Sequence, residues 1–316
     1  MILRVLQRLG ILVVSLFASS VLVFAFMAIL PGDPARVALG VNASDEAVAQ
    51  LREQFGLDRP LVVQYLDWVG GLLTFRLGNS YVSGAPIGPQ VADRLQVTLW
   101  LVLTATVIAT IIAIPLGVLA AVRHRKPSGL AISAVSQVGV AVPAFLAGIL
   151  LITVFAVQLG WLPANGWTPP VVDPAMFVKQ LILPALALGL VQGAVLTRYV
   201  RSSVLDVQRE DFMRTARAKG LSPMAAMRRH GLRNAAIPVV TVLALQLATL
   251  LVGAVVVERV FVVPGLGSLL LDSVGQRDLK MVQDVVMVLV VAVLIVNVVV
   301  EILYVLIDPR LRVGTR

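Results

Sequence analysis

Cysteine is absent from this 316-residue sequence, histidine occurs only twice, and charged residues make up 14% of the chain. Without cysteine the chain cannot form disulfides, thiolate metal sites or a cysteine nucleophile. His124 and His230 stand beside arginines outside the apolar runs, so a histidine proton relay or metal site has almost nothing to build on. A soluble domain carries about 25% charged residues. The shortage of charge, with 59% hydrophobic residues and a mean hydropathy of +0.94, makes the lipid bilayer the natural solvent.

Sequence patterns for catalysis are also missing. The P-loop pattern G-x-x-x-x-G-K-[ST] does not occur, so we expect the chain to bind and hydrolyse no ATP by a P-loop of its own. No nucleophile is paired with a base, and no acids or histidines cluster at one depth, which argues against a membrane-embedded enzyme. We therefore predict no catalytic residue, metal ligand or cofactor-binding residue, and an energy source outside this chain.

Six apolar runs are long enough to cross a hydrocarbon core, which takes about 20 residues. They occupy residues 9–30, 95–122, part of 131–162, 181–197, 235–257 and 285–307. The runs are continuous rather than alternating, which favours helices over membrane-barrel strands. The sequence thus predicts an all-α, polytopic membrane protein with six transmembrane helices. The first run resembles a signal peptide, but it is too long and no A-x-A cleavage pattern follows, so we expect an uncleaved anchor.

The distribution of lysine and arginine predicts the orientation of these spans, because cytoplasmic loops carry the excess of both residues. With the N-terminus inside, the cytoplasmic segments hold 17 of the 26 basic residues and the outer segments hold nine. We therefore predict a multi-pass protein of the bacterial inner membrane with both termini in the cytoplasm. This asymmetry explains the net charge of +9 and the pI near 10.8 without nucleic acid as a partner.

Residues 31–94 form the longest segment between the predicted spans. Ser44 is a typical N-cap followed by acidic residues, and Gly56 is a typical helix stop. Pro60 suits the first position of a second helix. A turn-rich stretch, 79–89, then leads into the second span.

Two outer segments leave alternatives open. The helices of 31–94 can dock an extracytoplasmic partner, or they can lie on the membrane surface with Tyr65 and Trp68 in the interfacial aromatic belt. Residues 258–283 contain glycines around a short apolar stretch, which is typical of a re-entrant or surface half-helix. Such a segment can line the outer mouth of a pathway, or it can be a capping loop.

The segment 198–233 combines nine basic residues with dense helix punctuation. One helix is expected over about 202–219, with Gly220 just past its end, and Ser222-Pro223 start a second helix, 224–233. The very short turn predicts a rigid helical elbow, and we call residues 198–233 the elbow throughout.

The elbow is a candidate for force transmission to a soluble partner. Phe212, Ala216 and Lys219 recur at helical spacing, which makes a small and partly apolar surface. The alternative is that its basic residues only satisfy the positive-inside bias; the tight punctuation favours docking. The residues predicted to couple the chain to a partner are Arg214, Thr215, Ala216, Arg217, Ala218, Lys219, Gly220 and Leu221.

Ionisable residues are absent from the first five predicted spans, whereas ion-coupled carriers keep such groups in the membrane. A self-sufficient channel or ion-coupled carrier is therefore the weaker hypothesis; it predicts solute flux through this chain alone. Pairs such as Gly189 and Gly193 are typical of helix packing. The uncharged polar residues that either line a pathway or pack between helices are Gln192, Thr241, Gln246, Thr249 and Asn297.

Several short motifs stand in order along the chain. They are Leu30-Pro31-Gly32-Asp33-Pro34-Ala35, Phe55-Gly56-Leu57-Asp58-Arg59-Pro60, Gln64-Tyr65, Leu77-Gly78-Asn79-Ser80, Arg214 to Leu221 with Arg229-His230-Gly231-Leu232-Arg233-Asn234, Val260-Phe261 with Pro264-Gly265-Leu266-Gly267, Arg277-Asp278, and Asp308-Pro309-Arg310-Leu311-Arg312. Taken together, this ordered set resembles the B-type permease subunits of dipeptide and oligopeptide ABC importers. The elbow motif is similar to this family's form of the "EAA" loop, although Arg214-Thr215-Ala216 replaces the generic Glu-Ala-Ala. The proline often found after the Arg-Asp pair is missing, which affects the expected shape of the last outer loop.

The resemblance implies a type I ABC importer permease fold that works by alternating access. It implies a heterodimer with a homologous second permease, two cytoplasmic ATPase subunits that bind ATP and magnesium, and an extracytoplasmic solute-binding protein. Members of the family carry dipeptides, oligopeptides, nickel complexes, haem or other small solutes. The predicted domains are residues 1–30 with the first span, an outer helical subdomain at 31–94, and a core permease domain at 95–316 that includes the coupling loop 198–233.

Overall fold

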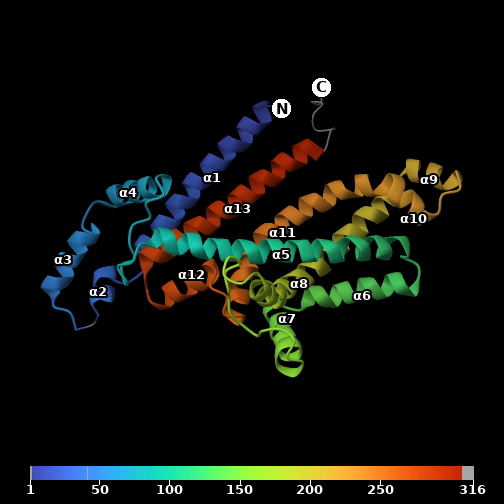
Figure 1. Cartoon of the computed structure of the whole chain (residues 1–316). Coiled ribbons are helices and arrows are strands. Elements are labelled where there is room, and N and C mark those ends of the chain that lie inside the picture. The colour runs from blue at the N-terminus through green and yellow to red at the C-terminus, as the bar shows by residue number, and fades with distance from the viewer. Residues whose placement is uncertain (1, 41, 308–316) are drawn as a thin grey trace. The chain divides into compact units, whose positions relative to one another are not determined.

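The computed structural model describes residues 2–40 and 42–307, and over these residues the chain is helical apart from turns and one isolated bridge between Asn79 and Pro86 (Figure 1). The predicted all-α class is confirmed. The predicted motif at 308–312 lies outside the described residues. The helices are α1 Ile2–Ile29, α2 Pro34–Leu39, α3 Asp45–Phe55, α4 Leu61–Leu73, α5 Ile87–Val122, α6 Pro127–Ala141, α7 Ala144–Leu151, the π-helix η1 Ile152–Gln158, α8 Pro174–Gln208, α9 Asp211–Ala218, α10 Pro223–Ala226, the π-helix η2 Met227–Gly231, α11 Leu232–Val260, α12 Leu266–Gly275 and α13 Leu279–Ile307.

Five of these helices are long and apolar enough to cross a membrane by themselves, and a sixth span exists if one bent pair counts as a span. The prediction of six spans is confirmed in that form, and the third span expected within 131–162 is this bent pair. There, α6 and the α7–η1 run meet at an angle of 101°. Proline lacks an N–H and pushes the residue before it out of the helical region. Val142 is accordingly extended, with ψ 121°, and Pro143 caps α7.

The described chain packs as two units, one of residues 99–263 with 296–307 and the other of residues 2–98 with 264–295. The domain limits predicted at 30 and 94 stay predictions. In the first unit α8 packs against α6, α7 and α11. A Cβ on Gly189 would lie 2.8 Å from Ile108 Cγ2, and one on Gly117 would lie 2.6 Å from Val200 Cβ. The predicted packing role of the small residues is therefore confirmed, since their missing side chains let α5 and α8 approach closely.

In the second unit, helices far apart in the sequence share one apolar core. Ile87 and Val91 of α5 pack with Leu266 of α12 and with Met281 and Val285 of α13. Helix α5 begins at Ile87, inside the stretch predicted to be turns, because the turn closes earlier through the bridge at Pro86. The backbone N–H of Leu266 donates to Thr98 Oγ1 at 2.9 Å, which fixes the start of α12.

Candidate coupling element and outer polar network

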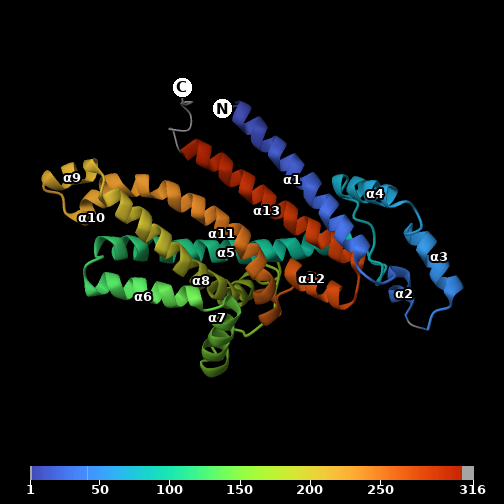
Figure 2. The same cartoon turned by 180° about the vertical axis from the view of Figure 1, so that it is seen from behind.

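The first arm of the elbow is two helices rather than the single helix predicted over 202–219. Helix α8 ends at Gln208, and α9 begins at Asp211. Glu210 between them is extended, with ψ 147°, and serves as the N-cap of α9. The last N–H groups before the break bond three residues back, from Arg209 to Asp206 and from Glu210 to Val207, which is how a helix end tightens and stops. Figures 1 and 2 show α9 and α10 at the shared end of α8 and α11.

The turn between α9 and α10 has the predicted punctuation. Gly220 adopts φ +91°, in the region that favours glycine, and a Cβ there would meet nothing within 4 Å. The glycine is thus required by backbone conformation and not by lack of space. Ser222 Oγ accepts a hydrogen bond from the N–H of Ala225 at 3.3 Å, and Pro223 occupies the first position of α10. Both predicted capping roles are confirmed.

The second arm of the elbow does not end near residue 233 as predicted. Helix α10 passes through the π-helix η2 into α11 without a break in the helical run, so the run extends from Pro223 to Val260. A π-helical segment inside a helix frequently marks a functional position. The second arm of the elbow is therefore continuous with the fifth predicted span.

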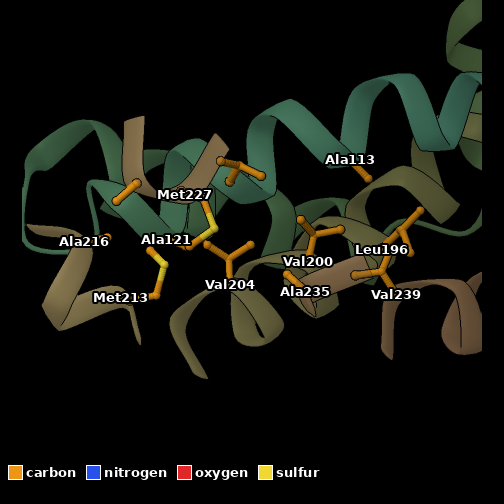
Figure 3. Packing of buried hydrophobic residues seen from close by; sticks show 12 residues of the cluster. Ala113, Ala121, Leu196, Val200, Val204, Met213, Ala216, Met227, Ala235 and Val239 are labelled. Atoms are coloured by element: carbon orange, nitrogen blue, oxygen red, sulfur yellow. The ribbon is translucent and has the colours of Figure 1, made fainter. Parts of the chain in front are cut away.

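The underside of the elbow is an apolar cluster (Figure 3). Met213 of α9 and Met227 of η2 are buried beside Ala216 and Val204. A Cβ on Gly231 would lie 2.3 Å from Met227 Sδ and 3.5 Å from Met213 Sδ, so both methionines approach this glycine. Burial of Met213 and Met227 in the elbow was not predicted from the sequence. The three-residue spacing of Met213 and Ala216 was the available signal.

The predicted coupling residues divide between this cluster and the solvent. Ala216 is 7% exposed and Leu221 is half-buried, whereas Phe212 is 40% exposed, so the predicted face of Phe212, Ala216 and Lys219 is not one face. The exposed predicted residues are Arg214, Thr215, Arg217, Ala218, Lys219 and Gly220. Among the described residues, Arg214 forms its ion pair with exposed Asp211, at 3.3 Å. The elbow therefore presents a basic outer surface over an apolar underside.

The five predicted polar residues of the spans lie on α8, α11 and α13, and none lines either of two cavities of about 490 and 360 Å³ in the described chain. Gln192, Thr241 and Asn297 are half-buried. Thr249 is exposed and donates to the carbonyl of Leu245 at 3.2 Å. Gln246 is 9% exposed, and its Nε2 has no hydrogen-bond partner among the described residues.

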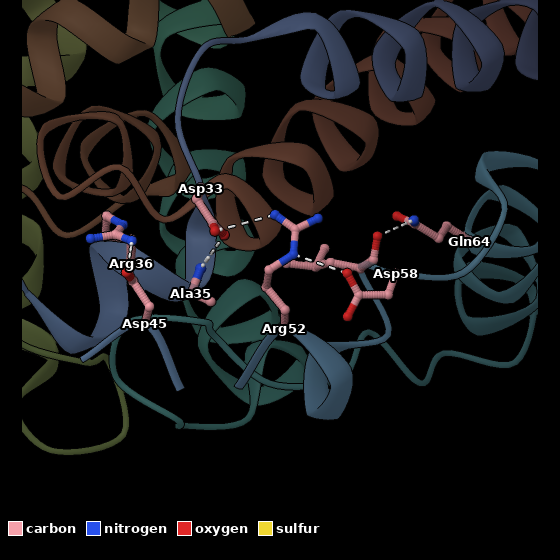
Figure 4. A network of polar contacts seen from close by, with 8 residues as sticks. Asp33, Ala35, Arg36, Asp45, Arg52, Asp58 and Gln64 are labelled. Carbon is pink, nitrogen blue, oxygen red and sulfur yellow. Dashed lines mark hydrogen bonds and ion pairs between the residues drawn. The ribbon is translucent and has the colours of Figure 1, made fainter. Parts of the chain in front are cut away.

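In the second unit, a polar network joins the first two sequence motifs (Figure 4). Asp33 caps α2 by accepting from the N–H of Ala35 at 3.0 Å, and its other oxygen lies 3.2 Å from Arg52 Nη1. Arg52 Nε also donates to Asp58 at 3.0 Å. The bonds to Asp58 and then Asp33 raise the pKa of Arg52 above its usual value. Ser44 and Gly56 cap α3 as predicted, whereas Pro60 is the N-cap of α4 rather than its first residue.

Buried carboxylates hold α4 and the 79–86 turn to α13. Trp68 Nε1 donates to Asp284 Oδ1 at 2.7 Å, and Lys280 Nζ lies 3.3 Å from Asp284 Oδ2. Asp278 accepts from Ser80 Oγ and from the N–H of Tyr81, and it also caps α13 through the N–H of Met281.

These contacts bear on the two alternatives left open for the outer helices. Trp68 is 6% exposed, which argues against the alternative that places it in the interfacial aromatic belt. Tyr65 shares a 2.8 Å hydrogen bond with Ser20 of α1. Nothing local in the sequence marks the Trp68–Asp284 pair, because the two residues are 216 positions apart.

The 258–283 segment contains the expected short helix, α12, whose residues Leu266 and Leu269 are buried within the second unit. A re-entrant position for this helix stays a prediction, as does the alternative of a capping loop. The cavity of about 490 Å³ in the same unit is lined by Arg52, Arg59, Arg76 and Lys280, with Asp67 as an opposing charge.

Comparisons with known proteins cover nearly the whole chain. The family described as binding-protein-dependent transport system inner membrane component matches residues 113–313, and its N-terminal counterpart matches residues 1–102. The glutathione transport system permease protein GsiC of Escherichia coli O6:H1 strain CFT073 is 44% identical over 98% of both chains. Its counterpart in Salmonella typhimurium is 43% identical over the same share.

Two solved structures share the fold at 19% identity. One is the inward-facing MetNI methionine ABC transporter, with a TM-score of 0.58 over 69% of this chain and 96% of that chain. The other, a crystal structure of an amino acid ABC transporter with histidines, has a TM-score of 0.53 over 68% and 93%.

Proposed function

The chain belongs to the family of binding-protein-dependent transport system inner membrane components, and we propose that it moves peptides or a related small solute by alternating access. As a member it is a permease subunit of a binding-protein-dependent ABC importer and a multi-pass inner membrane protein. The glutathione permeases among its relatives support a peptide-like cargo, since glutathione is a small peptide derivative.

The observation that carries this proposal is the elbow. Its exposed basic surface, formed by residues 214, 215 and 217–220, lies over the buried pair Met213 and Met227, and its second arm continues into α11. A surface with this construction can receive the movement of a soluble partner and pass it to a membrane helix. Two ATPase subunits that bind ATP and magnesium are the proposed partners at this surface. ATP shifts the transporter between states only through its different affinity for them.

The remaining partners follow from the same proposal. A homologous second permease completes the pathway, and an extracytoplasmic binding protein delivers the solute to the outer face. The cavity of about 490 Å³ beside the outer helices supports docking there, because Arg76 in its lining forms no ion pair with another described residue, whereas Arg52, Arg59 and Lys280 are already paired with carboxylates. Both termini lie in the cytoplasm, as the distribution of basic residues predicts.

Because the sequence contains no cysteine, a single introduced cysteine can test which partner the elbow contacts and on which side of the membrane it lies. A single Lys219→Cys substitution in the assembled complex should crosslink to an ATPase subunit, and in intact cells a membrane-impermeant maleimide should not label it. Ser83→Cys, in the exposed turn of the outer subdomain, is the matched control and should be labelled from outside without crosslinking. External labelling of position 219, or no crosslink to any nucleotide-hydrolysing subunit, would refute the coupling role.

The competing hypothesis of a self-sufficient channel or carrier gives a different result. The chain alone in liposomes should pass no glutathione or dipeptide without ATPase subunits and nucleotide. Flux through the isolated chain would favour that hypothesis instead.

A further inference from the structure

A second cavity, of about 360 Å³, lies among α5, α6 and α8, where the elbow begins on α8. Its lining shares no residue with the predicted coupling residues 214–221 or with the outer polar network. It is lined on α8 by Arg198 and Arg201 and on α6 by Ser133, Ser136 and Gln137. Its described lining includes no carboxylate. The cavity therefore concentrates positive charge at a place where the apolar run of the fourth span ends.

The two arginines have no counter-charge within the described chain. Neither Arg198 nor Arg201 forms an ion pair or side-chain hydrogen bond with another described residue, and the Nε of Arg201 is fully buried without a partner. A buried guanidinium N–H without an acceptor is costly, and an anion that accepts from it would remove that cost.

The hydroxyl groups of the cavity add a second requirement. Ser133, Ser136 and Thr197 each donate to a carbonyl of their own helix, at 2.9, 2.9 and 2.6 Å. A hydroxyl has one donor hydrogen and two acceptor lone pairs. The oxygens are therefore left as acceptors, so a fitting ligand carries an anionic group for the arginines and hydroxyl donors for these oxygens.

The surface beside the cavity is apolar. Leu130, Ala134 and Val138 of α6 recur every four residues, next to the lining residues Ser133 and Gln137, and all three are exposed. Acyl chains would cover such a stripe, whereas a free anion would leave it bare.

We propose that this cavity binds the headgroup of an anionic, hydroxylated phospholipid such as phosphatidylglycerol, with its phosphate on Arg201 and Arg198 and its glycerol hydroxyls on the serine and threonine oxygens. Basic pockets between membrane helices are a recurring form of anionic lipid site. Phosphatidylethanolamine fits less well, because its ammonium group would lie beside two guanidinium groups.

The test uses the complete complex in vesicles of equal phosphatidylglycerol and phosphatidylethanolamine, followed by extraction and native mass spectrometry of retained lipid. The wild type should retain phosphatidylglycerol selectively, and Arg201→Gln should reduce that retention about fivefold, as expected for one basic residue. Arg125→Gln is the matched control: it removes an exposed charge outside the cavity lining and should retain lipid like the wild type.

A second variant separates lipid binding from folding. Ser133→Phe fills the cavity and keeps both arginines, and it should also lose phosphatidylglycerol while the complex keeps its unfolding midpoint. Retention unchanged in both variants, equal loss in Arg125→Gln, or a bound inorganic phosphate in place of lipid would each overturn the proposal. Because the readout is lipid retention, it is independent of the transported solute.

Discussion

Two regions of this chain are stabilised by different kinds of contact. One is the elbow, and the other is the outer segment, by which we mean residues 31–94 together with residues 278–284 that they contact. In the elbow, Met213 and Met227 pack with Ala216 and Gly231 in a cluster of apolar side chains. Methionine is flexible and adapts to irregular surroundings. Apolar contact is non-directional, so a small displacement of α9 changes its neighbours without leaving a polar group unpaired.

The outer segment depends instead on directional bonds to buried carboxylates. Asp284 is fully buried between Trp68 and Lys280, and Asp278 joins the 79–86 turn to the start of α13. Moving either partner would leave a buried charge unpaired, which is strongly unfavourable. The difference is what the proposed coupling role requires: an elbow that can move against its neighbours, and an outer segment that keeps its geometry.

The largest expected effect comes from breaking the buried pair of the outer segment. Lys280→Met removes the cationic partner of Asp284 and should lower the free energy of unfolding by about 3 kcal/mol. The measurement is the unfolding midpoint of the purified complex. The double variant Lys280→Met with Asp284→Leu should recover much of the loss, because the unpaired charge is then gone.

An exposed ion pair in the same segment provides the control. Arg59 lies 3.0 Å from Asp67, but both side chains are about 60% exposed. Arg59→Met should therefore cost less than about 1 kcal/mol. Equal losses for Lys280→Met and Arg59→Met would mean that burial of Asp284 does not determine the stability of the outer segment.

A smaller effect on stability, but a large one on function, is expected from the turn glycines of the two regions. Gly220 has φ +91° and Gly84 has φ +69°, and a Cβ on either glycine would find open space. Valine at either position should cost about 1–2 kcal/mol of backbone strain. Only Gly220→Val should disturb the relation between ATP hydrolysis and solute uptake, because only that turn sets the position of α9 against α10.

The paired measurement is the number of solute molecules taken up per ATP hydrolysed in proteoliposomes. Gly84→Val should match the wild type and Gly220→Val should fall severalfold while all spans still insert. Equal uptake per ATP in the two variants would remove the functional distinction between the two regions.

Local features of both regions were predictable from the sequence, because the residues that cause them are adjacent. The caps at Ser44, Gly56 and Ser222 are set by a side chain or a φ angle within one turn. The apolar runs likewise fixed the fold class. The break at Arg209–Glu210 was missed because no glycine or proline marks it, and the bend at Pro143 was missed because the apolar run continues through it.

The contacts that define the outer segment could not be predicted from one sequence. Trp68 and Asp284 are 216 residues apart, and Ser80 and Asp278 are 198 apart. Each of these residues has an ordinary local explanation as an interfacial tryptophan, a turn serine or a boundary acid. Only the folded chain shows that they pair. The coupling role of residues 214–221 stays a prediction, since it concerns a partner that the chain itself does not contain.

The smallest expected effect concerns the charge that surrounds Tyr81 in the outer segment, a feature with no counterpart in the elbow cluster. Burial, and then the negative charges of Asp284 and Asp278, raise the pKa of Tyr81 above its usual value. The folded chain thus holds this proton more tightly than the unfolded chain, whose tyrosine titrates near pH 10. Stability from this group is fully present below about pH 10 and is lost as the pH rises toward the folded pKa.

The test compares the wild type with Tyr81→Phe, which keeps the stacking on Phe55, at 4.3 Å between ring centroids, and cannot ionise. The wild type should therefore lose up to about 1 kcal/mol relative to Tyr81→Phe between pH 8 and pH 11, measured as the difference in unfolding midpoint at each pH. A difference that stays constant over this range would mean that neither burial nor the carboxylates raise the pKa of Tyr81, and the contrast between a charged outer segment and an apolar elbow would then rest on packing alone.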